Sequence, residues 1–260
     1  MKVSTIASAK LRPVLLRRSS PFHRAVTSAL LLGAALAFVA ATEVRDVPSG
    51  RMAIQRPAGA PLGSIILIPG GSTQLSISDA GQPSNGGNFV LRIRREFVQA
   101  GYAVAYVEDP ANLRAPIAAM RAIARPVVFL ATSNGTIVAV DNALALGKDG
   151  PDALVLTSTV TTPSLRFSLP VTALQASRLQ APTLFIHNTN DLCKYSRPGD
   201  ARSAASADKN ATWLEVTIDP VPREDQCGPF APHGYAGIES DVVRQIVDWI
   251  AAHATARIDS

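Results

Sequence analysis

The first 41 residues contain no aspartate or glutamate, and this absence explains the basic character of the chain. The full sequence of 260 residues has 25 Lys and Arg against 20 Asp and Glu, a formal net charge of +5. Six basic residues lie in that acid-free segment: Lys2, Lys10, Arg12, Arg17, Arg18 and Arg24. Removing these six from 25 leaves 19 basic residues against 20 acidic ones. A nucleic-acid-binding protein keeps its basic residues on the folded body, so this class of partner is excluded.

Internal repeats and low-complexity segments are also missing from the sequence. Hydrophobic residues make up 47% of the chain, which is typical of a globular protein and argues against a repeat array or a disordered chain. We expect residues 42–260 to form a single domain, because about 220 residues are enough for one sizeable core. The nearly neutral body offers no electrostatic attraction for a charged substrate.

The acid-free segment 1–41 predicts export. A basic region that extends to Arg24 precedes 17 uncharged residues, 25–41, which end on the small residues Val39-Ala40-Ala41. This arrangement is typical of a signal peptide that is cleaved before Thr42. An uncleaved N-terminal anchor is the alternative, since the apolar run is at the short limit for a membrane span. In either case we expect the body to be periplasmic or secreted, with a membrane contacted only through an uncleaved segment.

Cysteine is scarce, with Cys193 and Cys227 as its two occurrences. Exported proteins keep disulfides that cytosolic proteins rarely have. A bridge between the two would close a loop of about 35 residues and stabilise the fold by about 3–4 kcal/mol. Two buried free thiols are the alternative. A metal site of Asp191, Cys193, Cys227 and His233 fits no common zinc spacing, so we expect neither a metal nor a cofactor.

Apolar segments alternate with helical segments from residue 42 onward. Strands are expected at 51–56, 64–68, 102–107, 127–130, 153–157, 183–187 and 213–218. Helices are expected at 89–99, 116–124, 135–146, 171–179, 199–207 and 238–253. Continuously apolar strands that alternate with helices predict an α/β protein, a three-layer sandwich with a mostly parallel, doubly wound sheet. Ligands of such proteins bind beyond the carboxyl ends of the strands.

The segment 127–136 (VVFLATSNGT) carries the most specific signal. It predicts a buried strand, a tight turn at Ser133 and a helix rich in small residues. This pattern resembles the nucleophile elbow of the α/β-hydrolase superfamily, G-x-S-x-G, with Ala131 at the first glycine position and Gly135 at the second. Small residues are needed there because the strand and the helix approach each other closely. The resemblance extends from about residue 64 to the C-terminus and implies an α/β-hydrolase fold with Ser133 as nucleophile.

The superfamily also sets the order of the other catalytic residues, with the acid after a later strand and the histidine last. Asp191 follows the strand expected at 183–187, and His233 precedes the last helix. The resemblance therefore implies a Ser133, His233 and Asp191 triad. The body also contains competing loop acids and two further histidines, which we expect to pack locally or to lie in the last helix: Asp200, Asp219, Glu224, His187 and His253.

The cysteines take positions that match this arrangement. The layout D-x-C, then C, then H-G is similar to that of a group of exported bacterial α/β-hydrolases. The resemblance implies that a disulfide between Cys193 and Cys227 ties the loop of the acid to the loop of the histidine. Such a link would pre-organise the two side chains whose geometry the mechanism needs.

An oxyanion hole needs two backbone N–H groups. One is expected from Asn134, directly after the nucleophile, and the other from the loop after strand 64–68. The family often has His-Gly-x in that loop, whereas this chain has Pro69-Gly70-Gly71. We assign the second N–H to Gly71, with Ser72 as the alternative.

The sequence leaves little room for a lid, since about 25 residues separate the strands expected at 153–157 and 183–187. We therefore expect an open site for a small-molecule or extended ester. The predicted activity is the hydrolysis of carboxylic esters through an acyl-enzyme. A peptidase or amidase with the same triad remains an alternative, as does a non-catalytic binding protein on the same scaffold.

Overall fold

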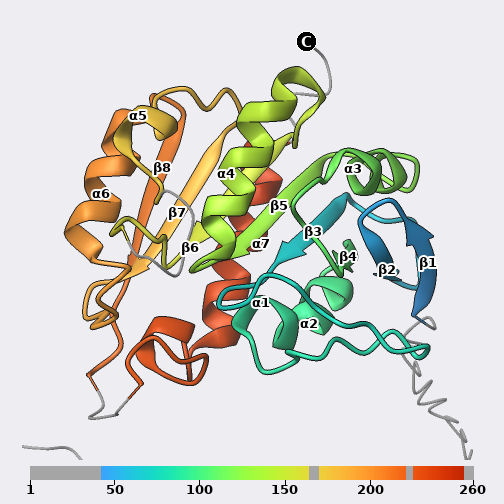
Figure 1. Ribbon diagram of the computed structural model, residues 1–260, viewed down its shortest axis with the longest axis horizontal. Helices are drawn as coiled ribbons and strands as arrows, with labels where there is room; N and C mark the ends of the chain where they lie inside the picture. The colour runs from blue at the N-terminus through green and yellow to red at the C-terminus, as the bar shows by residue number, and fades with distance from the viewer. Residues whose placement is uncertain (1–41, 164–169, 221–224, 255–260) are drawn as a thin grey trace, which may run out of the picture. The chain divides into compact units, whose positions relative to one another are not determined.

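A computed structural model describes residues 42–163, 170–220 and 225–254 of the chain. These residues form an eight-stranded sheet with the strand order β1-β2-β4-β3-β5-β6-β7-β8 (Figure 1). Strands β3 to β8 pair in parallel, whereas β2 is antiparallel to both β1 and β4. The strands are β1 (Glu43–Val47), β2 (Gly50–Gln55), β3 (Ser64–Ile68), β4 (Ala103–Val107), β5 (Val127–Thr132), β6 (Ala153–Thr157), β7 (Thr183–Asn188) and β8 (Ala211–Val216).

The central strands are apolar along their whole length because both faces of the sheet are covered. Every residue of β3, β4, β5 and β6 is buried. In β5, Val128 and Leu130 pack into the core on one face, while Val127, Phe129 and Ala131 pack into the core on the other. Successive side chains of a strand point to opposite faces, so a strand with two covered faces needs apolar residues at every position.

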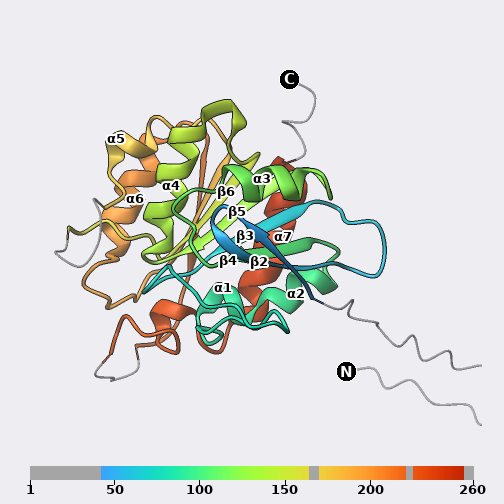
Figure 2. The ribbon, with the colours of Figure 1, turned by 45° about the vertical axis from the view of Figure 1, so that its right-hand side comes forward.

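Helices cover both faces, which confirms the predicted three-layer architecture. Figure 2 shows α3 and α4 on the opposite side of the sheet from α1 and α2. One core contains residues of α1 (Phe89–Arg92), α2 (Arg94–Gln99) and α7 (Glu239–His253). The second core contains residues of α3 (Arg114–Arg121), α4 (Gly135–Leu146), α5 (Ala173–Ala176) and α6 (Pro198–Ala207).

One strand was missed and several predicted helix and strand boundaries were wrong. The strand β1 was not predicted, because EVRDV is mostly polar and is held at the sheet edge by its antiparallel pairing with β2. The single helix expected at 89–99 is divided at Ile93 into α1 and α2. Strand β8 begins two residues earlier than predicted and ends at Val216, and α5 has four residues rather than the nine expected at 171–179. Strand ends and short helices depend on tertiary partners, which a local pattern does not contain.

The parallel strands β3, β5, β6 and β7 all end at one edge of the sheet. The loops that follow them gather there, together with the loop that leads into α7. Between β6 and β7 the described residues contain α5 and no inserted domain, as expected for a lidless protein. The predicted leader 1–41 lies outside the described residues. Within the described ranges, no helix combines the length and the apolar character needed to cross a membrane.

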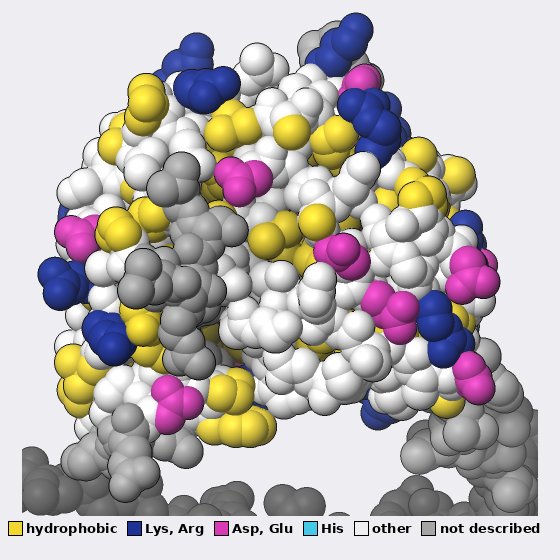
Figure 3. Space-filling view, viewed as in Figure 1, with side chains coloured by type: hydrophobic (Ala, Val, Ile, Leu, Met, Phe, Trp, Pro, Cys, Tyr) yellow, Lys and Arg dark blue, Asp and Glu magenta, His cyan; other side chains and the backbone are white. Residues whose placement is uncertain are grey.

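Acidic and basic side chains are interspersed on the face shown in Figure 3. Several charged residues of the described chain form exposed ion pairs, such as Arg114 with Asp149 and Arg202 with Glu215. Exposed pairs of this kind contribute little to stability, on the order of 0–1 kcal/mol each. On the visible described surface, the basic residues do not form one continuous field.

Candidate active site

Ser133 lies at a sharp turn between β5 and α4. Its φ is 51°, a left-handed backbone conformation that non-glycine residues adopt only where the surroundings hold them. Gly135 is required here, since a Cβ at that position would lie 2.4 Å from the carbonyl oxygen of Ile68. A Cβ on Gly70 would lie 2.7 Å from the Cβ of Ser133. The end of β3 and the start of α4 thus approach as closely as the predicted elbow requires.

The backbone of Ser133 is held on both sides, which fixes the direction of its side chain. Its N–H donates to the carbonyl of Thr157 at the end of β6, at 3.0 Å. Its carbonyl accepts from the N–H of Thr136 at 2.9 Å and from the hydroxyl of the same residue at 2.6 Å. Ser133 itself is partly exposed. The turn therefore presents a hydroxyl at the protein surface on a rigid base.

Asp191 and His233 form a buried hydrogen-bonded pair. The Nδ1 of His233 lies 2.8 Å from Oδ2 of Asp191, and both side chains are almost completely buried, at 4% and 0% exposure. The other carboxylate oxygen of Asp191 accepts from the backbone N–H of Cys193 at 2.9 Å. With both oxygens occupied, the carboxylate holds one ring nitrogen of His233 and leaves Nε2 available.

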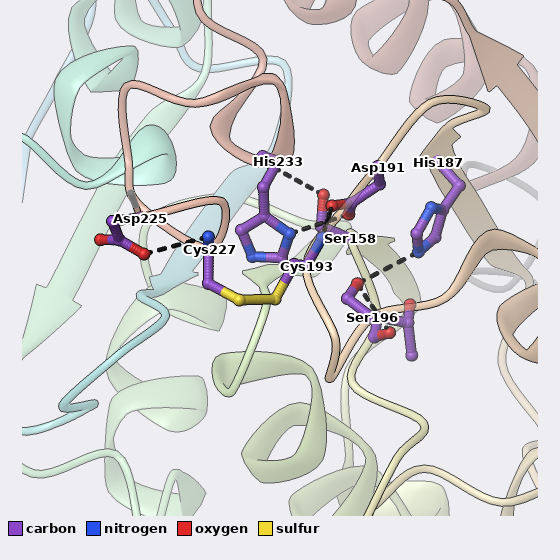
Figure 4. The surroundings of a disulfide bond; sticks show 9 residues. Ser158, His187, Asp191, Cys193, Ser196, Asp225, Cys227 and His233 are labelled. Carbon is purple, nitrogen blue, oxygen red and sulfur yellow. Dashed lines mark hydrogen bonds and ion pairs between the residues drawn. A yellow bond between two sulfur atoms is a disulfide. The ribbon is translucent and has the colours of Figure 1, made fainter. Parts of the chain in front are cut away.

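A disulfide joins Cys193 to Cys227, as predicted, and links the loop after β7 to the loop before α7. Figure 4 shows the bridge beside the Asp191–His233 pair. The backbone N–H of Cys227 donates to Asp225 at 3.1 Å, which orders the second loop locally. The bridge occupies both sulfur atoms, so the alternative metal site loses its two thiolate ligands.

A small cavity of about 100 Å³ lies between these loops. It brings the nucleophile elbow, the loop after β3 and the histidine loop to one place. Its lining includes Gly70, Gly71, Phe89, Ser133, Cys227 and His233. The Nε2 of His233 is buried and has no hydrogen-bond partner among the described residues, so the bond from Ser133 Oγ to Nε2 is not formed in this structure. Such bonds are often long in unliganded enzymes and tighten when a substrate binds.

The two residues assigned to the oxyanion hole lie close together. The side chain of Asn134 donates from Nδ2 to the carbonyl oxygen of Gly71 at 2.9 Å. The backbone N–H of Asn134 lies at the start of α4, where the first N–H groups of a helix have no partner within the helix. Gly71 has a φ of 69°, which a residue with a Cβ would adopt only with strain. The positive end of α4 also favours negative charge at this point.

The competing acids do not join this cluster. Asp200 is exposed in the first turn of α6, Asp219 is exposed after β8, and Glu224 lies outside the described residues. His253 contacts the carbonyl of Trp249 in the last helix. These positions leave Asp191 as the carboxylate beside His233 within the described chain.

A second serine–histidine pair, Ser196 and His187, lies nearby and is also drawn in Figure 4. Ser196 Oγ lies 3.2 Å from Nε2 of His187, but both residues are 0% exposed. The hydroxyl of Ser196 donates to the carbonyl of Thr159 at 3.0 Å, and the ring of His187 stacks on Trp213. Burial lowers the pKa of His187, which keeps the imidazole neutral. This pair therefore packs locally, as expected for His187, and has no access to a substrate.

Three residues near the site were not found from the sequence. Ser158 and Tyr235 are buried beside the backbone of His233, with their hydroxyl oxygens 3.0 Å apart. Arg92 donates to the carbonyls of Pro229 and Gly234 and pairs with Glu239 at 2.8 Å. A serine, a tyrosine and an arginine in isolation carry no signal of these roles, because their partners are distant in the sequence.

Comparison with known proteins supports the fold. No protein-family model matches the sequence, and the curated proteins give no sequence match. A dienelactone hydrolase from Anabaena variabilis superimposes with a TM-score of 0.55 at 13% identity, covering 82% of this chain and 99% of that chain. A sugar hydrolase from Lactococcus lactis gives a TM-score of 0.55 at 13% identity, covering 80% and 98%.

A cold-adapted esterase from an Arctic intertidal metagenomic library gives a TM-score of 0.55 at 11% identity and covers 82% of this chain and 92% of that chain. At such low identity these similarities concern the fold and not the substrate. Together with the mostly parallel sheet and the helices on both of its faces, they show that this chain has the α/β-hydrolase fold.

Proposed function

We propose that the protein is a serine hydrolase that cleaves carboxylic esters, with Ser133 as nucleophile, His233 as general base and Asp191 as the residue that orients His233. One observation carries the proposal. The Asp191–His233 pair is buried and hydrogen-bonded at 2.8 Å, the Nε2 of His233 has no partner among the described residues, and His233 and the strained Ser133 line the same cavity. A nucleophile, a base and an orienting acid in this relation are the elements of acyl transfer.

In the proposed reaction Ser133 Oγ attacks the carbonyl carbon of the ester while Nε2 of His233 takes the hydroxyl proton. The tetrahedral intermediate then collapses, the bond to the alkoxy group breaks, and His233 returns the proton to the leaving alcohol. Water next attacks the acyl-enzyme, again giving its proton to His233, and the carboxylic acid leaves as Ser133 is reprotonated. Asp191 keeps the imidazole in the required tautomer and stabilises the imidazolium.

The negative oxygen of the intermediate would be stabilised by the backbone N–H groups of Asn134 and Gly71. Each such donor is worth about 100- to 1000-fold in turnover where it has been removed from other enzymes. The hydrogen bond from Nδ2 of Asn134 to the carbonyl oxygen of Gly71 supports this assignment, since it holds the two residues together.

The small cavity favours esters with a short acyl group. About 100 Å³ beside Ser133 accommodates only a few non-hydrogen atoms. We further propose that the protein acts outside the cytoplasm, which the Cys193–Cys227 disulfide and the basic, apolar leader support.

One observation favours a second candidate, a binding protein without catalytic activity: the bond between Ser133 and His233 is not formed. A peptidase or amidase would use the same residues as an esterase, so only an assay of its substrates distinguishes these two kinds of hydrolase.

Labelling with a fluorophosphonate probe tests the proposal. The full-length protein should label, and Ser133→Ala should not. Ser196→Ala is the matched control, since it removes the hydroxyl of the other serine–histidine pair and should leave labelling intact. Unlabelled protein is assayed in parallel on p-nitrophenyl esters of increasing acyl length and on peptide amides, with short esters expected to react fastest. A folded wild-type protein that does not label would overturn the hydrolase proposal in favour of the binding protein.

A further inference from the structure

Two buried hydroxyl groups, on Ser158 and Tyr235, lie where the loops of the proposed site meet. Ser158 directly follows β6, and Tyr235 comes two residues after His233. Both residues are 0% exposed, and both have left-handed backbones, with φ values of 46° and 59°. Among the described residues Ser133 is the third non-glycine residue with a positive φ. Conformations of this kind cluster at functional sites, where surrounding contacts hold them.

Each polar hydrogen at the two hydroxyl groups is donated in a hydrogen bond. Tyr235 donates its hydroxyl proton to the carbonyl of Ile186 at 2.8 Å, and Ser158 donates its hydroxyl proton to the carbonyl of His233 at 2.7 Å. The backbone N–H of Ser158 lies 3.0 Å from the tyrosine oxygen and 3.1 Å from the carbonyl of Ile186. Three donors thus meet three acceptors in a region closed to water, where each bond is costly to lose.

The two residues lie in segments that lead to all three residues of the proposed triad. Thr157, the neighbour of Ser158, accepts the N–H of Ser133 at 3.0 Å. Ile186 belongs to β7, the strand that leads to Asp191. The third acceptor is His233 itself, and Figure 4 shows Ser158 bonded to it beside the Asp191 contact. The pair therefore connects the ends of β6 and β7 to the histidine loop.

Resting on the proposed function, we infer that Ser158 and Tyr235 are positioning residues that set the orientation of His233 toward Ser133. The Asp191 carboxylate holds the imidazole only at Nδ1, so the ring can still pivot about that bond. The Ser158 hydroxyl fixes the backbone of His233, and Tyr235 fixes Ser158. Together the two contacts determine where Nε2 points. A misplacement of about 1 Å can lower turnover about 100-fold without a change in substrate binding.

Tyr235→Phe in the full-length protein tests the inference, with p-nitrophenyl acetate as substrate. We expect kcat to fall about 10- to 100-fold and KM to stay within about twofold, because the alignment and not the cavity is changed. Tyr106→Phe is the matched control. Tyr106 is also fully buried, and its hydroxyl donates to the backbone carbonyl of Gly81, away from the cavity. Both variants should lose thermal stability, Tyr235→Phe the more because its hydroxyl also accepts the N–H of Ser158, while only Tyr235→Phe should lose turnover.

Ser158→Gly and Ser158→Ala provide a second test that separates positioning from folding. Glycine accepts the left-handed backbone at Ser158 without strain, so Ser158→Gly should unfold at a higher temperature than Ser158→Ala. Both variants lose the hydroxyl and should be equally slow.

The outcomes distinguish the inference from the proposed function. A wild-type protein that neither hydrolyses the ester nor labels at Ser133 would overturn both. If the wild type is active, the inference alone is overturned when Tyr235→Phe matches Tyr106→Phe in kcat, or when Ser158→Gly is as fast as the wild type.

Discussion

Asn134 has two roles in the proposed oxyanion hole. The substitutions Asn134→Ala and Asn134→Asp test whether these roles affect activity independently of stability. Its backbone N–H is one expected donor, and its side chain holds the carbonyl of Gly71 at 2.9 Å. Alanine keeps the first donor and removes the side-chain bond. A single neutral hydrogen bond contributes about 0.5–1.5 kcal/mol. If that energy is expressed in the transition state, kcat/KM falls about 2- to 12-fold.

Asn134→Asp should be more harmful, although aspartate has nearly the shape of asparagine. The carboxylate cannot donate to Gly71, and it places a negative charge beside the oxygen that becomes negative in the intermediate. Two unit charges about 6 Å apart repel by about 3 kcal/mol at an effective dielectric constant of about 20. We therefore expect kcat/KM to fall about 100-fold. The same charge at the start of α4 interacts favourably with the helix dipole, by about 0.3–1 kcal/mol.

The assay compares kcat/KM on p-nitrophenyl acetate with the thermal unfolding of each variant. Asn134→Asp should be at least as stable as Asn134→Ala, since both lose the side-chain bond and only aspartate gains the interaction with the helix dipole, and yet Asn134→Asp should be the slowest of the set. Asn210→Ala is the control, since Asn210 also donates from its side chain to a backbone carbonyl, that of Leu179, outside the cavity. An Asn134→Asp variant as active as the wild type would refute the assignment of Asn134 to the oxyanion hole.

Two further predictions concern stability. Replacing Cys193 and Cys227 together by alanine should lower the free energy of unfolding by about 3–4 kcal/mol, because the bridge closes a loop between residues 34 positions apart; denaturant unfolding measures this, and an unchanged midpoint would contradict it. Burial lowers the pKa of His187 from its ordinary 6.5, so as the pH falls below about 6.5 the unfolded chain takes up a proton that the folded protein refuses. Stability should therefore decrease with falling pH by up to about 1.4 kcal/mol per pH unit. Unfolding at several pH values checks this, and His187→Gln should lose that part of the slope.

The architecture was predictable because its signals are local. Strands such as β5 are apolar at every position, which only a sheet covered on both faces explains. The turn at Ser133 was predictable because small residues at 131 and 135 are typical of such a turn, although the structure places the close approach of Gly135 at the end of β3, beside Ile68 and Pro69, and not at β5. Strand β1 was missed because a polar edge strand is stabilised by its partner and not by its own composition.

The resemblance implied the order of the candidate residues and the pairing of Asp191 with His233, whereas the distances between them were not predictable. Asp191 and His233 are 42 positions apart, and no local pattern indicates that they meet at 2.8 Å. The positioning contacts of Ser158 and the support that Arg92 gives to the histidine loop likewise join segments distant in the chain. An isolated serine or arginine has the same local signal on any surface.

The sequence by itself indicated the class of fold, the position of the turn at Ser133 and the two cysteines available for a bridge, since each follows from residue size, periodicity or chemical type over a few positions. Only the tertiary structure decided how closely Asp191 and His233 meet, which hydroxyls lie beside them, and how small the cavity is. The physical reason is that hydrogen bonds and cavities depend on distances of a few tenths of an ångström between segments that only the folded sheet brings together.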